Sequence, residues 1–164
     1  MINKNNAQGF SLMELMMAVA ILGIISSIAI PSYTQYVLKA KRTEAKTEVL
    51  RIAQLQESYY VQNLSYAKDA KGLGFSDVSV ATETGLYDVK TLPLTSAGVA
   101  DTTCDGTNVK PCAAYVIEAS PASGSQQSND SGCQAFRLSS TGLKQAKSSS
   151  DTGWTNHDTS SACW

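Results

Sequence analysis

The sequence predicts an α+β fold in which one long N-terminal helix packs on a four-stranded antiparallel sheet, with a C-terminal region stapled by disulfides. Three observations predict it. An uncharged apolar run at residues 15–30 passes into an amphipathic pattern that lasts to about residue 62. Four short segments of strand-like composition follow, each bounded by turn residues. Four cysteines lie beyond residue 100, and an even count in an exported domain indicates disulfides.

The apolar run has the length and composition of a membrane helix. Counted from Phe10 to Ile30 it has 21 residues, which is about 30 Å of helix and matches the hydrocarbon core of a bilayer. The alternative is the buried core helix of a soluble domain, but such a helix rarely stays apolar all round for so long. Pro31 follows, and because proline lacks a backbone N–H we expect a kink there.

Glu14 stands at the start of this run. An ionised carboxylate inside a membrane segment costs at least about 2.5–3.5 kcal/mol and normally has a partner. No Lys or Arg follows within the run, so the partner must come from another chain or from a free amine. An ordinary secretory signal loses its apolar region with the cleaved piece, whereas a cut at Gly9 would leave that region on the mature chain.

Beyond Pro31 the helix is expected to continue to about residue 62 as an amphipathic segment. Its predicted buried face, at spacings of mostly three, four and seven, consists of Val37, Ala45, Val49, Ile52, Ala53, Gln56, Tyr59 and Tyr60. The charged residues expected largely elsewhere on the helix are Lys39, Arg42, Lys46, Arg51 and Glu57. Glu48 and Arg51 are three residues apart and can form an ion pair on the helix surface.

Four strands are predicted at residues 86–92, 113–119, 133–138 and 142–146. We expect Pro93 and Pro121 to end the first and second of them, because proline cannot donate to a sheet ladder. Ser139, Ser140 and Thr141 separate the last two segments and predict a hairpin. Strands that follow one another after a single helix favour an antiparallel sheet packed on that helix.

The composition predicts neither an enzyme nor a cofactor nor a metal site. The one histidine, His157, lies in a loop rich in Ser and Asp, where a Ser-His-Asp arrangement arises by composition alone. Cys104 and Cys112 lack zinc-site spacing. The calcium-like set Asp101, Asp105, Gly106 and Asn108 departs from the EF-hand pattern, which favours a turn. The net charge of −1 gives no bulk signal for nucleic acid.

The segment Gly9-Phe10-Ser11-Leu12-Met13-Glu14-Leu15, with the apolar run and Pro31 after it, resembles the class III signal of type IV pilins and type II secretion pseudopilins. In that family a prepilin peptidase cuts after the glycine and N-methylates the new first residue. The resemblance implies a cut between Gly9 and Phe10, N-methylation of Phe10, and an assembly role for Glu14 and Pro31, with Glu14 paired to the α-amine of a neighbouring subunit. Residues 56–67 and the final Cys163-Trp164 resemble the PilE-like group of minor pilins.

Pairing of the four cysteines is open on the sequence alone, because three connectivities exist. Cys104 and Cys112 are close enough for a local bridge. The resemblance implies the pairs Cys104–Cys112 and Cys133–Cys163, since pilins join a late strand to the chain end. The second bridge would hold residues 148–162, which carry too little apolar surface to order themselves.

The resemblance implies the type IV pilin fold in three parts: a leader peptide at 1–9, a transmembrane and filament-core helix at 10–30, and a periplasmic globular domain at 31–164. The precursor is expected to cross the inner membrane once, and the mature chain is expected in the extracellular pilus. The partners implied are major and minor pilin subunits in a helical filament, the prepilin peptidase, the inner-membrane assembly platform and, before assembly, membrane lipid.

The predicted function is that of a structural subunit that supports pilus biogenesis, twitching motility, adhesion or DNA uptake. The resemblance favours a minor pilin over the major one. A type II secretion pseudopilin with the same anchor is the first alternative. The second is a DNA-binding competence pilin, because some minor pilins of this group receive DNA. The candidate DNA contacts are Lys110, Arg137, Lys144 and Lys147, although a solvated face explains four scattered cations equally well.

Overall fold

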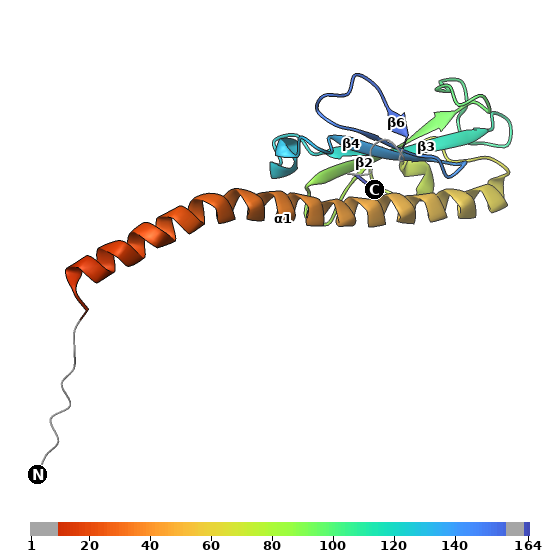
Figure 1. Cartoon of the computed structure of the whole chain (residues 1–164). Helices are drawn as coiled ribbons and strands as arrows, with labels where there is room; N and C mark the ends of the chain where they lie inside the picture. The colour runs from red at the N-terminus through yellow and green to blue at the C-terminus, as the bar shows by residue number, and fades with distance from the viewer. Residues whose placement is uncertain (1–9, 157–162) are drawn as a thin grey trace, which may run out of the picture. The chain divides into compact units, whose positions relative to one another are not determined.

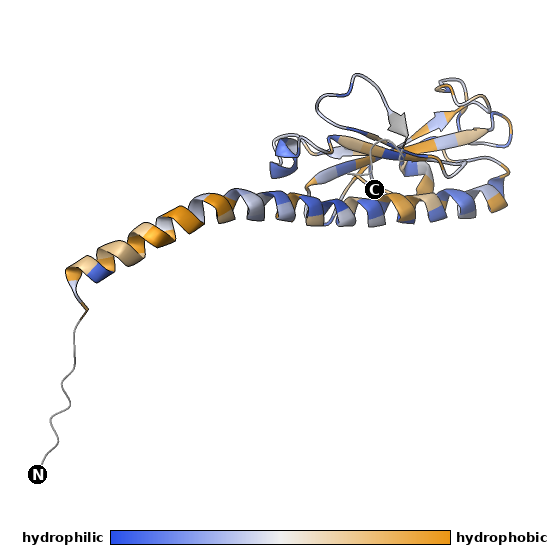
Figure 2. Cartoon of the chain, in the orientation of Figure 1, coloured by the Kyte–Doolittle hydropathy of each residue, from blue (hydrophilic) through white to orange (hydrophobic). Residues whose placement is uncertain are grey.

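The structure is a computed structural model that describes residues 10–156 and 163–164 of the chain. The chain divides into two units between Val37 and Leu38. Helix α1 (Leu12–Asn63) supplies the first unit and the opening of the second. Figure 2 shows how its composition changes: hydrophobic residues dominate its first half, whereas hydrophilic and hydrophobic residues alternate along its second half.

Within the second unit α1 buries one face against the sheet. The buried residues, at alternating spacings of four and three, are Leu38, Arg42, Ala45, Val49, Ile52 and Gln56. The expected face is confirmed for the last four of these. The prediction that Arg42 lies off this face is wrong, because the residue is only 3% exposed. Its guanidinium is neutralised by Asp130, 88 residues later in the chain, and a paired charge can be buried.

The described residues form one six-stranded antiparallel sheet in sequence order. Figure 1 shows strands of this sheet lying along the second half of α1. Its strands are β1 (Ser79–Ala81), β2 (Tyr87–Leu94), β3 (Ala114–Pro121), β4 (Ala135–Ser139), β5 (Lys144–Lys147) and β6 (Thr155–Asn156). The four predicted strands correspond to β2–β5, and the short strands β1 and β6 extend the sheet at its two edges. Two 3₁₀ turns complete the elements, η1 (Lys71–Leu73) and η2 (Gln126–Asn129).

Pro121 ends its strand as expected, whereas Pro93 does not. β2 continues through Pro93 to Leu94, and β3 includes Pro121 as its last residue. The ladder between β1 and β2 ends at Lys90, so Pro93 lies where β2 is an edge strand. Its carbonyl accepts a hydrogen bond from Asp101 N–H at 3.0 Å on that side. The missing N–H therefore faces outward from the sheet, where proline is tolerated.

The core lies between α1 and the sheet. Ala45, Val49 and Ile52 of the helix meet side chains from every strand from β2 to β5. The ring of Tyr87 packs edge-on against that of Phe136, with centroids 5.9 Å apart. In β3, Ile117 and Ala119 are fully buried while Glu118 between them is only half-buried, so this strand shows the alternation of a sheet with one face on the core.

The C-terminal end of α1 is fixed by a buried amide. Gln56 Nε2 donates to the Ala67 carbonyl at 3.0 Å and to Thr91 Oγ1 at 2.9 Å, while its Oε1 accepts from Ala67 N–H at 2.9 Å. The side chain thus pairs with the backbone of residue 67 as a neighbouring strand would. This contact lies in the segment 56–67 that carries the resemblance to PilE-like pilins, and it turns the chain from α1 toward the sheet.

Candidate functional site

The first unit presents apolar side chains all round the helix. Among the residues that the structure describes, α1 is the one helix long and apolar enough to cross a membrane, and no part of its most apolar window is buried within the chain. Leu15, Ile21 and Ile28 are 61%, 54% and 69% exposed. Contiguous apolar surface of this extent indicates contact with lipid or with other apolar helices.

Glu14 lies in the first turn of α1, and Phe10 precedes the helix. A carboxylate in a first turn interacts favourably with the helix dipole, which is a structural role in its own right. Within the described part of the chain, no hydrogen bond or ion pair reaches the Glu14 carboxylate. Gly9, the residue before the predicted cut, lies outside the described residues.

Pro31 lies inside α1. Its missing N–H leaves the carbonyl of Ser27 without its usual helical partner. The hydroxyl groups nearby bond within the helix: Ser27 Oγ donates to the Ile24 carbonyl at 2.7 Å, and Thr34 Oγ1 donates to the Pro31 carbonyl at 2.8 Å. Side-chain hydroxyls that are satisfied inside their own helix are compatible with an apolar surrounding.

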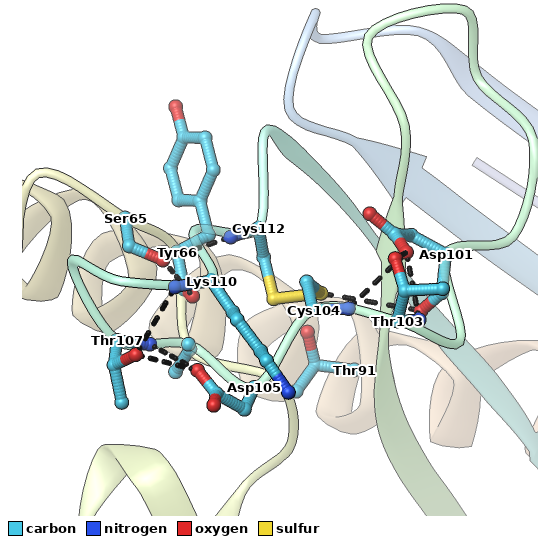
Figure 3. Close-up of a disulfide and its surroundings, with 12 residues drawn as sticks. Ser65, Tyr66, Thr91, Asp101, Thr103, Cys104, Asp105, Thr107, Lys110 and Cys112 are labelled. Carbon is cyan, nitrogen blue, oxygen red and sulfur yellow. Dashed lines mark hydrogen bonds between the residues drawn. A yellow bond between two sulfur atoms is a disulfide. The ribbon is translucent and has the colours of Figure 1, made fainter.

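A disulfide loop packs against the end of α1 (Figure 3). Cys104 and Cys112 are bonded, with Cα atoms 5.1 Å apart. Cys112 N–H donates to Ser65 Oγ at 2.9 Å, and Tyr66 N–H donates to the Cys112 carbonyl at 3.1 Å. The loop is therefore held to the segment that follows α1 by its second cysteine as well as by its own bridge.

Gly106 brings the middle of this loop close to the same segment. Its carbonyl accepts a hydrogen bond from Tyr59 Oη at 3.1 Å. Its φ is 85°, and a Cβ atom there would lie 3.1 Å from the backbone nitrogen of Lys68. Only glycine meets both conditions without strain.

The carboxylates of the loop are used to shape turns. Asp101 Oδ1 accepts from Thr103 Oγ1 at 2.7 Å and from Cys104 N–H at 3.2 Å, and Asp105 Oδ1 accepts from Thr107 Oγ1 at 2.6 Å. Hydrogen bonds from these threonines lower the pKa of both carboxyls. The turn interpretation of Asp101 to Asn108 agrees with this geometry. In the described residues, no group of three or more His, Cys, Asp or Glu is arranged for a metal ion.

The four candidate DNA contacts lie in three places. Arg137 and Lys147 are on the sheet face away from α1. Lys144 is on the opposite face, with Nζ 4.9 Å from the centroid of the Trp164 ring. Lys110 is in the disulfide loop, where it and Lys68 both help to lower the pKa of Asp105. The structure brings together only Arg137 and Lys147 of the four.

Arg137 is already engaged within the chain. Its Nε donates to Gln145 Oε1 at 2.8 Å, and its guanidinium carbon lies 4.3 Å from the centroid of the Trp154 ring. Glu118 is its register partner on β3. An arginine with an acceptor, an aromatic ring and a neighbouring carboxylate has fewer free donors for a phosphate than an open lysine.

The chain end is fastened to the sheet. Cys133 and Cys163 form the second disulfide, with Cα atoms 5.3 Å apart. Trp164 packs edge-on against Phe136, and its Nε1 donates to the Gln145 carbonyl at 3.0 Å. The last two residues thus join the core. His157 lies outside the described residues.

Sequence reasoning missed a buried polar cluster beside this disulfide. Arg42 Nε donates to Asp130 Oδ2 at 2.7 Å, and Gln127 Nε2 donates to the same oxygen and to the Leu38 carbonyl, both at 3.0 Å. Asp130 is 1% exposed. The cluster ties the loop before Cys133 to α1. The one available signal was the position of Arg42, four residues after Leu38 and three before Ala45, in register with the buried face.

Two family models match the chain. The prokaryotic N-terminal methylation motif matches residues 4–30. The family described as "Type IV minor pilin ComP, DNA uptake sequence receptor" matches residues 31–137. The two matches adjoin at Pro31 and together reach from the polar N-terminus into β4. The second match includes the disulfide loop and ends before Lys144.

Curated relatives include pilins and a pseudopilin. The chain is 33% identical over 102 residues to the type IV major pilin protein PilA of Myxococcus xanthus, covering 56% of this chain and 46% of that one. It is 31% identical over 106 residues to the type IV major pilin protein PilE of Neisseria gonorrhoeae, covering 62% and 59%. It is 33% identical over 70 residues to the type II secretion system core protein G of Pseudomonas aeruginosa, covering 43% and 49%. The chain thus spans about half the length of these relatives.

Proposed function

Because this chain belongs to the type IV minor pilin family described as ComP, DNA uptake sequence receptor, we propose that it is a structural subunit of a type IV pilus. The observation that carries the proposal is the N-terminal segment. A methylation motif at residues 4–30 coincides with the apolar first part of α1, where Glu14 is the one charged residue between 10 and 30 and has no partner among the described residues. An anchor alone would not need that charge, whereas a filament of packed helices has a use for it.

Assembly follows from burial of these helices against one another. Each subunit contributes one apolar helix, and close packing of these helices, which keeps their surfaces out of water in the filament, gives the filament its cohesion. Glu14 sets the register, because a buried carboxylate and a buried α-amine each cost several kcal/mol alone and recover much of that cost as a pair. The amine is that of Phe10 in a neighbouring subunit once residues 1–9 are removed.

The proposed life cycle has three parts of the chain acting in turn. Residues 1–9 are a leader that the prepilin peptidase removes before Phe10 is methylated. Residues 10–30 hold the precursor in the inner membrane, with residues 31–164 in the periplasm, until the assembly platform transfers the helix into the filament. The N-terminal methylation match supports the processing step. The membrane step is supported by the length and hydropathy of α1.

Substitution of the lone charge tests the assembly step. Glu14→Val should leave cleavage at Gly9 intact and should strongly reduce the amount of this chain in filaments sheared from the cell surface. Ser26→Val is the matched control, since it removes a polar side chain from the same helix without removing a charge, and it should assemble normally. Mass spectrometry of sheared filaments and of membranes measures both. Normal incorporation of the Glu14→Val chain would contradict the pairing.

The similarity to a secretion core protein keeps a pseudopilin as the second candidate. The two functions predict different locations for the same processed chain. A pilus subunit appears in the sheared filament fraction, whereas a pseudopilin stays with the membranes. The Ser26→Val control and the unmodified chain both report on this, so the outcome does not depend on Glu14.

The family description supports DNA binding by the second unit, and we propose Lys110 as its leading contact. Lys110 lies within the matched residues, and it lies in the loop beside Lys68, whereas Lys147 lies beside Glu118. Electrophoretic shift of double-stranded DNA across a salt series tests this. Lys110→Gln should weaken binding and reduce the salt slope by about one, while Lys147→Gln should do neither. Equal effects of the two substitutions would contradict the assignment.

A further inference from the structure

Residues 148–154, the first part of the tail that follows β5, arch over the sheet face that points away from α1 (Figure 1), and a hollow lies beneath them. We name this hollow, of about 600 Å³, the tail groove. The residues that matter in its lining are Glu118, Gln134, Ala135, Lys147, Asp151 and Trp154. Small-molecule sites in proteins have volumes of about 300–1,000 Å³, so the groove has the right size for one.

Two of its walls are fixed by contacts within the chain. The Trp154 ring is held at the rim by the guanidinium of Arg137. On the tail side, Asp151 Oδ2 accepts a hydrogen bond from Ser148 N–H at 2.7 Å. Ala135 in β4 supplies an apolar patch of the lining. The groove therefore combines one aromatic side chain with a lining that is more polar than apolar, and such a lining fits a polar, hydroxyl-rich ligand better than an apolar one.

The carboxylate of Glu118 is the strongest indication that the groove binds a ligand. Glu118 is half-buried on β3, and burial raises the pKa of its carboxyl while Arg137, Lys90 and Lys147 oppose that shift. Across the described ranges 10–156 and 163–164, no hydrogen bond reaches this carboxylate. A partly desolvated acceptor without a donor gains free energy from any N–H or O–H that enters the groove.

The charges around the groove decide what kind of donor this is. The two carboxylates, Glu118 and Asp151, are balanced by the two cations, Lys147 and Arg137. An anion such as phosphate would be repelled by the two carboxylates, and an ammonium ion would be repelled by Lys147. A neutral molecule with several hydroxyl groups avoids both repulsions, because hydroxyls donate to carboxylates and accept from an ammonium group.

We propose that the tail groove binds a neutral sugar unit. Its hydroxyls donate to Glu118 and Asp151 and accept from Lys147, and the apolar C–H face of the ring packs on the indole of Trp154. No covalent step is involved. The site is separate from the disulfide loop and from Glu14, so sugar binding requires neither DNA binding nor assembly of a filament.

The test uses the two tryptophans of the full chain as site reporter and internal reference. The protein is kept in dodecylphosphocholine micelles, because maltoside and glucoside detergents would supply a competing sugar. Lactose, maltose and methyl α-mannoside are titrated separately while the indole N–H signals are followed by NMR. At least one sugar should shift the Trp154 signal saturably. The Trp164 signal should stay in place, because its indole bonds to the Gln145 carbonyl on the core side.

Matched carboxylate variants make the assignment specific. Glu118→Gln keeps the shape but replaces an ionised acceptor by a neutral one, and should weaken sugar binding roughly tenfold. Asp77→Asn, an exposed carboxylate outside the groove, should leave the affinity unchanged. The proposal is overturned if no sugar moves the Trp154 signal, if Glu118→Gln binds as tightly as the unmodified chain, or if sodium phosphate or butylamine gives the shift in place of the sugars.

Discussion

Residues 10–37 carry their apolar side chains outward all round, whereas in the described residues beyond 37 an apolar core is enclosed between one face of α1 and a six-stranded sheet. Each region also contains a charge in an apolar setting. Arg42 in the second region is paired with Asp130 of the same chain. Glu14 in the first region has no partner within the described residues.

The difference shows where each region is completed. The second region satisfies its buried charge and its apolar face by itself, so it can fold as a unit. The first region leaves both open, and other molecules must supply lipid or helices for its surface and an amine for Glu14. Substitutions should therefore change folding stability in the second region and membrane or filament behaviour in the first.

The largest effect on stability is expected at the buried ion pair. Arg42→Met leaves Asp130 buried without its cation and should lower the free energy of unfolding by about 3–5 kcal/mol. Arg51→Met is the matched control, because Arg51 also pairs with a carboxylate, Glu48, but at an exposed position. It should cost about 0.5 kcal/mol or less. Urea unfolding followed by circular dichroism measures both, and equal losses would mean that the buried pair carries no special weight.

Sequence reasoning reached much of this architecture but not the ion pair. The apolar run, the helical spacing of Ala45 to Gln56 and four of the strands are local patterns, and each is visible within a few residues. The pairing of Arg42 with Asp130 joins positions 88 residues apart, and no local pattern marks Asp130 as buried. Strands β1 and β6 have three and two residues, too few for an alternation to be recognised.

The tail groove could not be predicted from the sequence for a similar reason. Glu118 and Trp154 are far apart in the sequence and meet only because the tail folds back over the sheet. The N-terminal site is the opposite case. Phe10, Glu14 and Pro31 lie within one short segment, so their pattern can be read directly from the sequence without knowledge of the fold. Family resemblance also supplied the expectation for the cysteine pairs, which spacing alone left open.

The two disulfides of the second region should differ in how much they stabilise it. The double substitution Cys133→Ser with Cys163→Ser opens a separation of 30 residues, and Cys104→Ser with Cys112→Ser opens one of 8. Chain entropy predicts losses of about 3.5 and about 2.5 kcal/mol. Urea unfolding gives the order, and limited proteolysis should cut the tail only in the first variant. A protected tail in that variant would show that the contacts of Trp164 suffice.

A smaller effect, and a gain in folding stability, is expected from a substitution at the residue that follows α1. Leu64 has a φ of 55° and is 73% exposed, so it adopts a left-handed conformation without burial to compensate. Leu64→Gly should raise the free energy of unfolding by about 1 kcal/mol. Leu50→Gly, at an exposed position inside the helix, should lower it by about the same amount. A loss in both variants would mean that Leu64 makes contacts that its exposure does not suggest.

The smallest change in folding stability is expected from a substitution in the first region. Leu22→Ala should leave the unfolding of the second region within about 0.3 kcal/mol of the unmodified chain, because distant sites are independent. Ile52→Ala, a truncation on the same helix but in the core, should cost about 2–5 kcal/mol. Near-ultraviolet circular dichroism in micelles reports the sheet domain for both. A comparable loss from Leu22→Ala would show that the two regions fold together.

The most direct measurement is the intact mass and N-terminal sequence of the chain recovered from sheared filaments. We expect a chain that begins at N-methylated Phe10 and is four hydrogens lighter than its reduced form, as two disulfides require. That result would establish a processed subunit whose first region was freed for assembly. A chain that retains Met1 and stays in the membrane would contradict it and would leave a simple membrane-anchored domain.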